Sequence, residues 1–275
     1  MGFNIRLYTK RSESVIELVG QRLLGKKYFS QLVKKPARKV VDFFKLIRQN
    51  FFDADLFAVS EIKANNPLKT KIISFSLFGN DPRYSENLKK VIKSYKEILP
   101  QWKCRIYVAK DVSSQTIQLL IGEGCEVFIM QGIGIDFRYT LWRFLAIEDK
   151  NAEAIIIRDL DSIAIEREKA IVEQWLSSDK KFHIIRDHIN HNSIIMAGMW
   201  GAKKNDINIK KQTKYQLLTN NYGVDQVFLC NVIYPIMKND IMVHDSFPRF
   251  AHENPIVIPL EFGESFIGEY MSAGK

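Results

Sequence analysis

The chain has 275 residues, of which 46% are hydrophobic and 26% are charged, as expected of a globular protein with a sizeable core. Its three cysteines lie far apart and form no CxxC pair, which argues against a disulfide framework and favours reduced thiols in a cytosolic protein. No apolar run approaches the roughly 20 residues that span a bilayer, and the N-terminus lacks a signal-peptide pattern. We therefore expect a soluble or peripheral protein.

The net charge of +9 is unevenly distributed along the chain. Residues 1–65 hold 13 lysines and arginines against 6 acidic residues, whereas the remaining 210 residues hold 27 against 25. The sequence therefore predicts a basic N-terminal segment, residues 1–65, and a second domain, residues 66–275. Nucleic acid, an anionic membrane or an acidic partner would meet the basic segment first.

Residues 11–52 place apolar side chains at helical spacing, with basic residues between them. A basic amphipathic helix of this kind can lie on a membrane surface. The alternative is a helix packed on its own domain or on a partner chain, which is the commoner use of an amphipathic helix. Residues 64–69 are interpreted as a linker.

Strands and helices alternate from Lys71 onward, with short connections between them. This pattern is typical of a parallel α/β sheet with helices on both faces, which binds ligands at the carboxyl ends of its strands. The expected strands are 71–79, 103–110, 125–130, 152–162 and 181–187. The expected helices are 85–99, 113–124, 137–149, 166–178, near 206–219 and 225–238.

The strand predicted at 152–162 ends in two carboxylates, Asp159 and Asp161. Buried charge is costly unless it is paired or holds a metal, and alternate residues of an extended segment point the same way. We therefore expect the pair to hold a hard divalent cation, which would neutralise phosphate groups on a ligand. The alternative is an ion pair with Arg158 or another arginine. A second Asp-x-Asp, at 53–55, is expected to cap a helix.

Several stretches together resemble the GT-A-type nucleotide-sugar glycosyltransferases, in particular bacterial enzymes of capsular and surface-polysaccharide synthesis. The resemblance implies a Rossmann-type, mixed and mostly parallel α/β sheet flanked by helices, and it covers about residues 71–270. It does not clearly extend to residues 1–65. The stretches are "SLFG" (76–79), "YTLWRFLA" (139–146), "RDLDS" (158–162), "IIRDHINHNSIIMAGMWGAK" (184–203), "VHDSF" (243–247) and "FIGEY" (266–270).

In that family the loop after the first strand holds the base and ribose of the donor. The resemblance places Ser76, Leu77, Phe78 and Gly79 there, with Tyr84 close behind. Glycine lets the backbone approach a ligand, and an aromatic ring can stack on a base. A core position is the alternative for Phe78.

Two arginines of the segment 137–149 are candidates for the donor pyrophosphate, because a guanidinium donates two parallel hydrogen bonds. Arg138 shares an expected helix face with Trp142, four residues later. Arg143 is favoured by its place in the "WRF" match.

The resemblance assigns Asp159 to ribose or metal and Asp161 to the metal, which would be Mn²⁺ or Mg²⁺. It implies a third protein ligand from the C-terminal region, where His244 matches the position and His252 is the fallback. Neutral imidazole is the ligand form.

The "RDHINH" and "MAGMWG" stretches would form the sugar pocket. Asp187 and His188 would contact sugar hydroxyls, Gly198 would allow close approach, and Trp200 would offer a flat apolar face, although a core tryptophan is the alternative. Asp187 and Asp225 are the candidates for a base that deprotonates the acceptor, where configuration is inverted. A helix N-cap is the alternative for Asp225.

The resemblance thus implies metal-dependent transfer of a sugar from a UDP-type or GDP-type donor to a glycan or lipid-linked acceptor. The implied location is the cytoplasm, with peripheral contact to the bacterial inner membrane through residues 11–52. The alternative is a basic nucleic-acid-binding or membrane-binding module with a non-catalytic nucleotide-binding fold. A nucleotidyl-transferring enzyme would require a glycine-rich, lysine-bearing loop that "SLFGNDPRY" lacks, and the "GIG" at 132–134 lacks the third glycine of a dinucleotide fingerprint.

Overall fold

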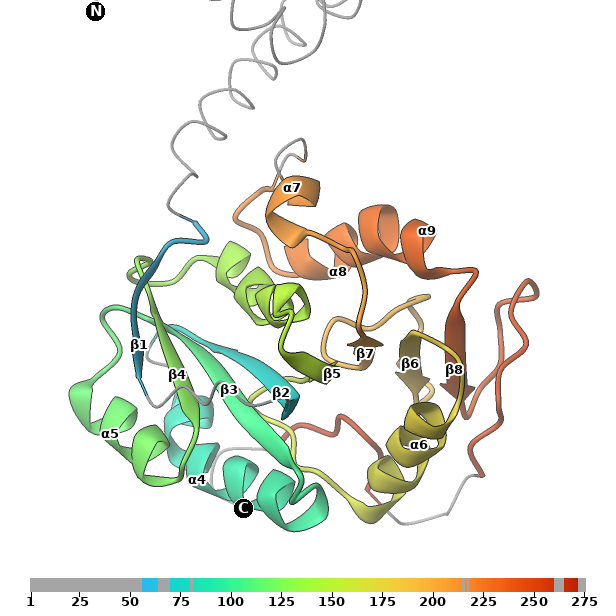
Figure 1. Cartoon of the computed structure of the whole chain (residues 1–275), viewed down its shortest axis with the longest axis horizontal. Helices are drawn as coiled ribbons and strands as arrows, with labels where there is room; N and C mark the ends of the chain where they lie inside the picture. The colour runs from blue at the N-terminus through green and yellow to red at the C-terminus, as the bar shows by residue number, and fades with distance from the viewer. Residues whose placement is uncertain are drawn as a thin grey trace, which may run out of the picture. The chain divides into compact units, whose positions relative to one another are not determined.

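The computed structural model places one compact unit, Asp53–Lys275, which holds all of the residues described below (Figure 1). The helices expected within 11–52 and the Asp-x-Asp at 53–55 lie outside these residues, so both remain expectations. The described residues are 56–63, 70–79, 82–213, 216, 218–259 and 265–271, without the side chains of 82–86.

The described strands form one eight-stranded sheet with the order β1-β4-β3-β2-β5-β7-β6-β8. Only β1 and β7 run antiparallel to their neighbours. The expected fold class, a mixed and mostly parallel α/β sheet, is therefore confirmed. The strands are β1 (Val59–Lys63), β2 (Thr70–Leu77), β3 (Trp102–Ala109), β4 (Glu126–Met130), β5 (Ala152–Ile157), β6 (Phe182–Arg186), β7 (Trp200–Lys203) and β8 (Ile241–Asp245).

Helices connect the parallel strands and cover both faces of the sheet. In Figure 1, α4, α5 and α6 lie below the sheet, and η3, α7, α8 and α9 lie above it. Helix η3 packs on β2, β3 and β5, and α7 and α8 pack in turn on η3. The helices are α4 (Pro82–Ile98), α5 (Ser114–Gly122), η3 (Phe137–Glu148), α6 (Glu166–Ser177), α7 (Ile209–Thr213), α8 (Val224–Phe228), η4 (Leu229–Ile233) and α9 (Tyr234–Met237).

Most of the expected elements are present, but three of the expected helices differ in kind or length. Helix η3 is a 3-10 helix rather than an α-helix. The helix expected near 206–219 is confined to α7 among the described residues, and the one expected at 225–238 changes from α to π geometry in η4 before α9 continues it.

The boundary expected at residue 65 is too late. Residues Val59–Lys63 form β1, which pairs antiparallel with β4 at the edge of the sheet. These residues therefore belong to the same unit as the other strands, and that unit begins at Asp53.

Strand β5 is shorter than the expected 152–162. It ends at Ile157, and the chain then turns, with the Ser162 amide and hydroxyl both donating to the Asp159 carbonyl at 3.4 and 3.1 Å. Asp159 and Asp161 therefore lie on a turn beyond the strand. Alternate residues of an extended segment point the same way, but residues on a turn do not have to.

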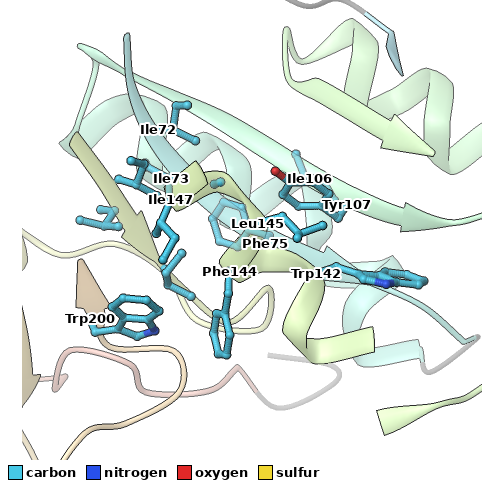
Figure 2. Close-up of a cluster of buried hydrophobic side chains, with 14 of the residues drawn as sticks. Ile72, Ile73, Phe75, Ile106, Tyr107, Trp142, Phe144, Leu145, Ile147 and Trp200 are labelled. Carbon is cyan, nitrogen blue, oxygen red and sulfur yellow. The ribbon is translucent and has the colours of Figure 1, made fainter. Parts of the chain in front are cut away.

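The core lies between the sheet and the helices on both faces, and Figure 2 shows part of it. Phe75 of β2 and Phe144 of η3 are fully buried there, together with Trp142 and Trp200. No helix in the described part of the chain is long and apolar enough to cross a membrane. All three cysteines are free thiols.

Candidate functional site

The site is centred on Arg143 of η3, whose backbone is held by the serines of β2. The Ser74 hydroxyl donates to the Arg143 carbonyl at 2.7 Å, and the Arg143 amide donates to the Ser76 hydroxyl at 3.0 Å. Both serines point to one side of β2, as alternate residues of a strand must. The predicted donor residue Ser76 therefore positions Arg143.

The Arg143 guanidinium joins two carboxylates. Its Nη1 donates to Asp159 in the turn after β5, and its Nη2 donates to Asp225 Oδ2 at the start of α8, at 2.8 Å. The Arg143 and Asp225 side chains are 6% and 9% exposed, whereas that of Asp159 is 49% exposed. One planar guanidinium thus forms ion pairs with two carboxylates, and one of them, Asp159, is open to solvent.

Gly198 packs directly against the Asp159 carboxylate. A Cβ atom at this position would lie 1.9 Å from Asp159 Oδ2, so no other residue fits without displacing the carboxylate. The segment that carries Gly198 is fixed by Gln226, whose Oε1 accepts from the Ala197 amide at 3.0 Å and whose Nε2 donates to the Ile195 carbonyl. The structure therefore gathers four residues singled out from the sequence, Arg143, Asp159, Gly198 and Asp225, and adds Gln226 to them.

Asp161 lies two residues further along the same turn and is partly exposed. Its carbonyl accepts from the Met271 amide at 2.7 Å, and Ser162 forms a β-bridge with Tyr270. The C-terminal segment thus runs against the carboxylate turn. In the sequence only the "FIGEY" match suggested that this segment belongs to the site. No residue pattern predicted the contact of Met271 with the turn.

The loop after β2 is lined by aromatic rings. Phe78 meets Tyr139 and Trp142 edge-on, with centroids 5.6 and 6.3 Å apart, and Tyr139 stacks on Trp142 at 4.1 Å. Gly79 has φ +71°, which favours glycine. Phe78 therefore packs in an aromatic cluster while it stays partly exposed.

The remaining residues predicted for the donor loop, Leu77 and Tyr84, show no contact that would bind a ligand among the described side chains. Leu77 is buried in the core, and the side chain of Tyr84 lies outside the described residues.

Gly132 of the "GIG" stretch has a packing role that the sequence did not reveal. A Cβ atom there would lie 2.5 Å from the Tyr139 ring and 2.7 Å from Trp142. Burial raises the pKa of Tyr139.

Asp187 lies apart from Arg143, with its carboxylate buried and fully engaged. Oδ1 accepts from the Ser246 hydroxyl at 2.6 Å, and Oδ2 accepts from the Ile267 amide and from Arg167 Nη2, both at 2.9 Å. His188 stacks on Phe266 at 4.1 Å. Asp187 and His188, both predicted for the sugar pocket, therefore contact the C-terminal segment.

Arg138 and Trp200 do not join the site. Arg138 pairs with Asp136, Nη2 to Oδ2 at 2.6 Å, and Trp200 is fully buried edge-on to Phe144 at 5.4 Å. The face shared by Arg138 and Trp142 was expected for 3.6 residues per turn, whereas a 3-10 helix has about 3.0. The prediction that Trp200 faces a sugar is wrong, and its core alternative is confirmed.

His244 is not placed to bind a metal. Its Nδ1 is hydrogen-bonded to His183 Nε2 at 2.8 Å, and its Nε2 to Gln174 Oε1 at 2.9 Å, so both ring nitrogens are engaged. Burial lowers the pKa of His244 to about 4 and that of His183 well below its ordinary value. The fallback, His252, meets the Tyr234 hydroxyl at 3.0 Å. The assignment of His244 as third ligand is corrected accordingly.

The turn itself retains a donor set that suits a hard cation. In the part of the chain that the structure describes, no three histidine, cysteine, aspartate or glutamate side chains gather. Magnesium and similar ions are commonly held by one or two carboxylates together with substrate phosphates and water, rather than by an all-protein cage. The half-exposed Asp159, beside which Gly198 places no side chain, and the partly exposed Asp161 fit that pattern.

No protein-family model and no curated protein matches the chain. Solved structures do match. The galactosyltransferase LgtC, in complex with donor and acceptor sugar analogs, is 13% identical over 64% of this chain and 74% of that chain, with a TM-score of 0.43.

Two further matches are also glycosyltransferases. Glucosyl-3-phosphoglycerate synthase from Mycobacterium tuberculosis, solved with Mg²⁺ and uridine-diphosphate, is 12% identical over 64% of this chain and 68% of that chain, with a TM-score of 0.42. GlyE of Streptococcus pneumoniae is 14% identical over 65% of this chain and 46% of that chain, with a TM-score of 0.44. All three TM-scores lie below 0.5.

Proposed function

We propose that the chain transfers a sugar from a nucleoside diphosphate donor to a hydroxyl group of an acceptor. The observation that supports this most directly is the Arg143 guanidinium between Asp159 and Asp225, beside the carboxyl ends of β2 and β5. Ligands bind parallel α/β sheets at this edge. The arrangement supplies a cation for phosphate oxygens and two carboxylates with different exposure.

Arg143 is the candidate for holding the donor diphosphate. Its side chain is almost fully buried, so its charge is poorly screened and its geometry is fixed by two carboxylates. A fixed guanidinium suits the charge that develops on a departing diphosphate. Asp159 and Asp161 would hold a divalent cation, Mn²⁺ or Mg²⁺, which neutralises phosphate charge when bound.

Asp225 is the candidate for the acceptor base. It is the predicted carboxylate that contacts the Arg143 guanidinium, whereas Asp187 is sequestered by Ser246, Ile267 and Arg167. If the reaction inverts configuration, Asp225 takes the proton of the acceptor hydroxyl. The hydroxyl oxygen then bonds to the sugar carbon as the diphosphate departs from that carbon. If configuration is retained, Asp225 keeps Arg143 in place.

The donor would be of the UDP or GDP type and the acceptor a glycan or lipid-linked sugar of surface-polysaccharide synthesis. Residues 11–52 would bring the enzyme to a membrane that carries the acceptor. These finer assignments follow from the sequence resemblance and await experiment.

Thermal-shift titrations with UDP and GDP, each with and without Mn²⁺, test the proposal. We expect stabilisation that requires nucleotide and Mn²⁺ together, because ligand binding raises the melting temperature by mass action. Asp159→Asn and Asp161→Asn should remove this stabilisation. Asp206→Asn is the matched control, since Asp206 is an exposed aspartate remote from the turn.

Slow release of UDP or GDP from sugar nucleotides without acceptor measures the chemical step. Arg143→Lys, which keeps the charge but loses the two-pronged donor, should lower this release by more than tenfold. Stabilisation that is indifferent to metal and unchanged in both aspartate variants would contradict the proposal. Nucleotide binding without turnover of any sugar nucleotide would favour a non-catalytic binding fold.

A further inference from the structure

A cavity of about 270 Å³ has no part in the site described above. It is formed around the start of α8 and by the π-helix η4. The residues that line it include Asn221, Tyr222, Val224, Val227 and Asn231.

The described lining carries no charged side chain. Amides, a threonine hydroxyl, a tyrosine ring and aliphatic groups make up the wall. A phosphate or nucleotide would find no counter-charge among the described residues of this wall, and burying its charge without a partner is costly. A neutral molecule with many hydroxyl groups suits this wall, because amides can donate to and accept from hydroxyls while an aromatic face covers C–H groups.

Local structure presents the Tyr222 side chain to solvent. Tyr222 is 91% exposed, although its ring meets Phe137 edge-on at 5.8 Å. The turn that carries it is fixed from both ends, because Asn220 Oδ1 accepts from the Phe137 amide at 2.7 Å and Gly223 has φ +81°. The exposed ring therefore stands on a well-anchored turn.

The π geometry of η4 supplies a second observation. A π segment within a helix is rare and is frequently found at functional sites, because the wider turn redirects side chains. Here it spans Leu229–Ile233, and Asn231 and Val232 of that segment line the cavity.

The cavity and the proposed catalytic residues share the first turn of α8. Val224 lines the cavity, and the next residue in the chain, Asp225, pairs with Arg143 at 2.8 Å. The same short helix thus contributes to the cavity wall and carries the carboxylate proposed to accept a proton.

We propose that this cavity binds a neutral sugar ring of the acceptor, stacked on Tyr222 and hydrogen-bonded to Asn231. The proposal rests on the proposed glycosyl transfer for the word acceptor, but the binding of a neutral glycoside can be measured without it.

Saturation-transfer NMR on the full chain tests the inference with methyl β-D-galactopyranoside and methyl β-D-glucopyranoside as neutral probes and D-glucuronate as the charged counterpart. At least one neutral probe should receive saturation and the charged one should not. Tyr222→Ala should weaken binding about tenfold, the size of one aromatic stacking contact. Tyr222→Phe should retain it.

Val227→Ala and Val257→Ala form a matched pair, since both valines are 60% exposed and only Val227 lines the cavity. The former should weaken the signal and the latter should not. Equal signals in wild type and Tyr222→Ala, equal binding of glucuronate, or no signal from any neutral probe would overturn the inference.

The two proposals fail separately. Metal-dependent nucleotide binding without glycoside binding would leave the transferase proposal standing and overturn the cavity. Glycoside binding that depends on Tyr222, in a protein that binds no nucleotide, would support the cavity as a sugar site and overturn the transferase.

Discussion

Arg143 shows how a single residue can set the chemistry of a site through its partners. Its carbonyl and amide are fixed by β2, and its side chain reaches one carboxylate after β5 and another at α8. Removing this cation would leave Asp159 and Asp225 without a shared counter-charge, which is a larger perturbation for the buried Asp225 than for the half-exposed Asp159.

Gly198→Ala is expected to separate folding from function. The new methyl group would meet the Asp159 carboxylate at 1.9 Å and must push it aside, since Gln226 holds the backbone that precedes Gly198. Metal-dependent nucleotide stabilisation should disappear in thermal-shift assays, while the free energy of unfolding falls by roughly 1–3 kcal/mol, the usual cost of overpacking.

Gly122→Ala is the matched control for that variant. Gly122 ends α5 with nothing within 4 Å of the added Cβ, so the exchange should leave nucleotide binding intact and change stability by about 1 kcal/mol or less. Unaltered metal-dependent binding in Gly198→Ala would show that Asp159 does not contact the ligand.

Residue by residue, the sequence predicted those positions whose neighbours are close in chain or fixed by the sheet. Asp159 follows a strand whose carboxyl end was expected on the ligand-binding side of the sheet. Arg143 and Asp225 were selected through motif matches. The position of His244 could not be predicted, because its partners His183 and Gln174 come from β6 and α6. Nothing near His244 in the chain shows that both of its ring nitrogens are already bonded.

At the scale of elements, the end of β5 separates opposite charges. Arg158 points into the core, where its Nε donates to Glu168 of α6 at 2.6 Å with both side chains 1% exposed. Asp159, the next residue, pairs with Arg143 of η3. The alternative expectation of an ion pair is thus met by Arg143 for Asp159, whereas Arg158 is paired with Glu168.

Arg158→Met should destabilise the fold strongly, because it leaves Glu168 as an uncompensated buried charge. We expect a loss of roughly 3–5 kcal/mol in urea unfolding, the range for breaking a buried pair. The double variant with Glu168→Gln should recover most of it. A loss in the single variant that the double variant does not reduce would mean that the arginine acts through packing alone.

The contact between β6, β8 and α6 contains two neutral, buried histidines and predicts acid sensitivity. The pKa of His244 is lowered to about 4 and that of His183 lies well below 6.5, chiefly through burial. Between pH 6.5 and about 4 the unfolded chain binds more protons than the folded one, so the free energy of unfolding falls as pH falls, by about 1.4 kcal/mol per pH unit for each histidine. Above pH 6.5 this contribution is fully present.

Urea unfolding at pH 7, 6 and 5 measures that slope. His244→Gln, which keeps a hydrogen-bonding side chain but cannot take up a proton, should reduce the slope by about one histidine's share. His252→Gln, at an exposed position, is the control and should leave the slope unchanged. Identical slopes in wild type and His244→Gln would assign the acid sensitivity to other groups.

Hydrophobic periodicity predicted the parallel strands and their crossover helices well, since each buries one continuous apolar face. It could not distinguish the 3-10 geometry of η3 or the π geometry of η4, because these depend on tertiary contacts and not on which residues are apolar. The β1 strand was also missed, since its residues are mostly exposed at the sheet edge and lack an apolar alternation.

For the whole molecule, the division of charge coincides with the start of the described unit. Residues 1–52 hold 12 lysines and arginines against 3 acidic residues, which leaves 28 of each sign in Asp53–Lys275. The net charge of +9 therefore belongs entirely to residues 1–52. The unit that carries the proposed site is formally neutral and has no overall charge with which to approach an anionic surface.

Full-length protein should therefore bind vesicles of phosphatidylglycerol and phosphatidylcholine, and a chain starting at Asp53 should not. Each basic residue near an anionic surface contributes about 1 kcal/mol, and the attraction is screened within a Debye length, so binding should decline steeply between 50 and about 300 mM salt. Co-sedimentation measures this, and nucleotide binding by the shortened chain, which keeps the whole described sheet, serves as the control for folding. Vesicle binding that is retained without residues 1–52, or that is unaffected by salt, would place membrane contact on the neutral unit or on apolar insertion instead.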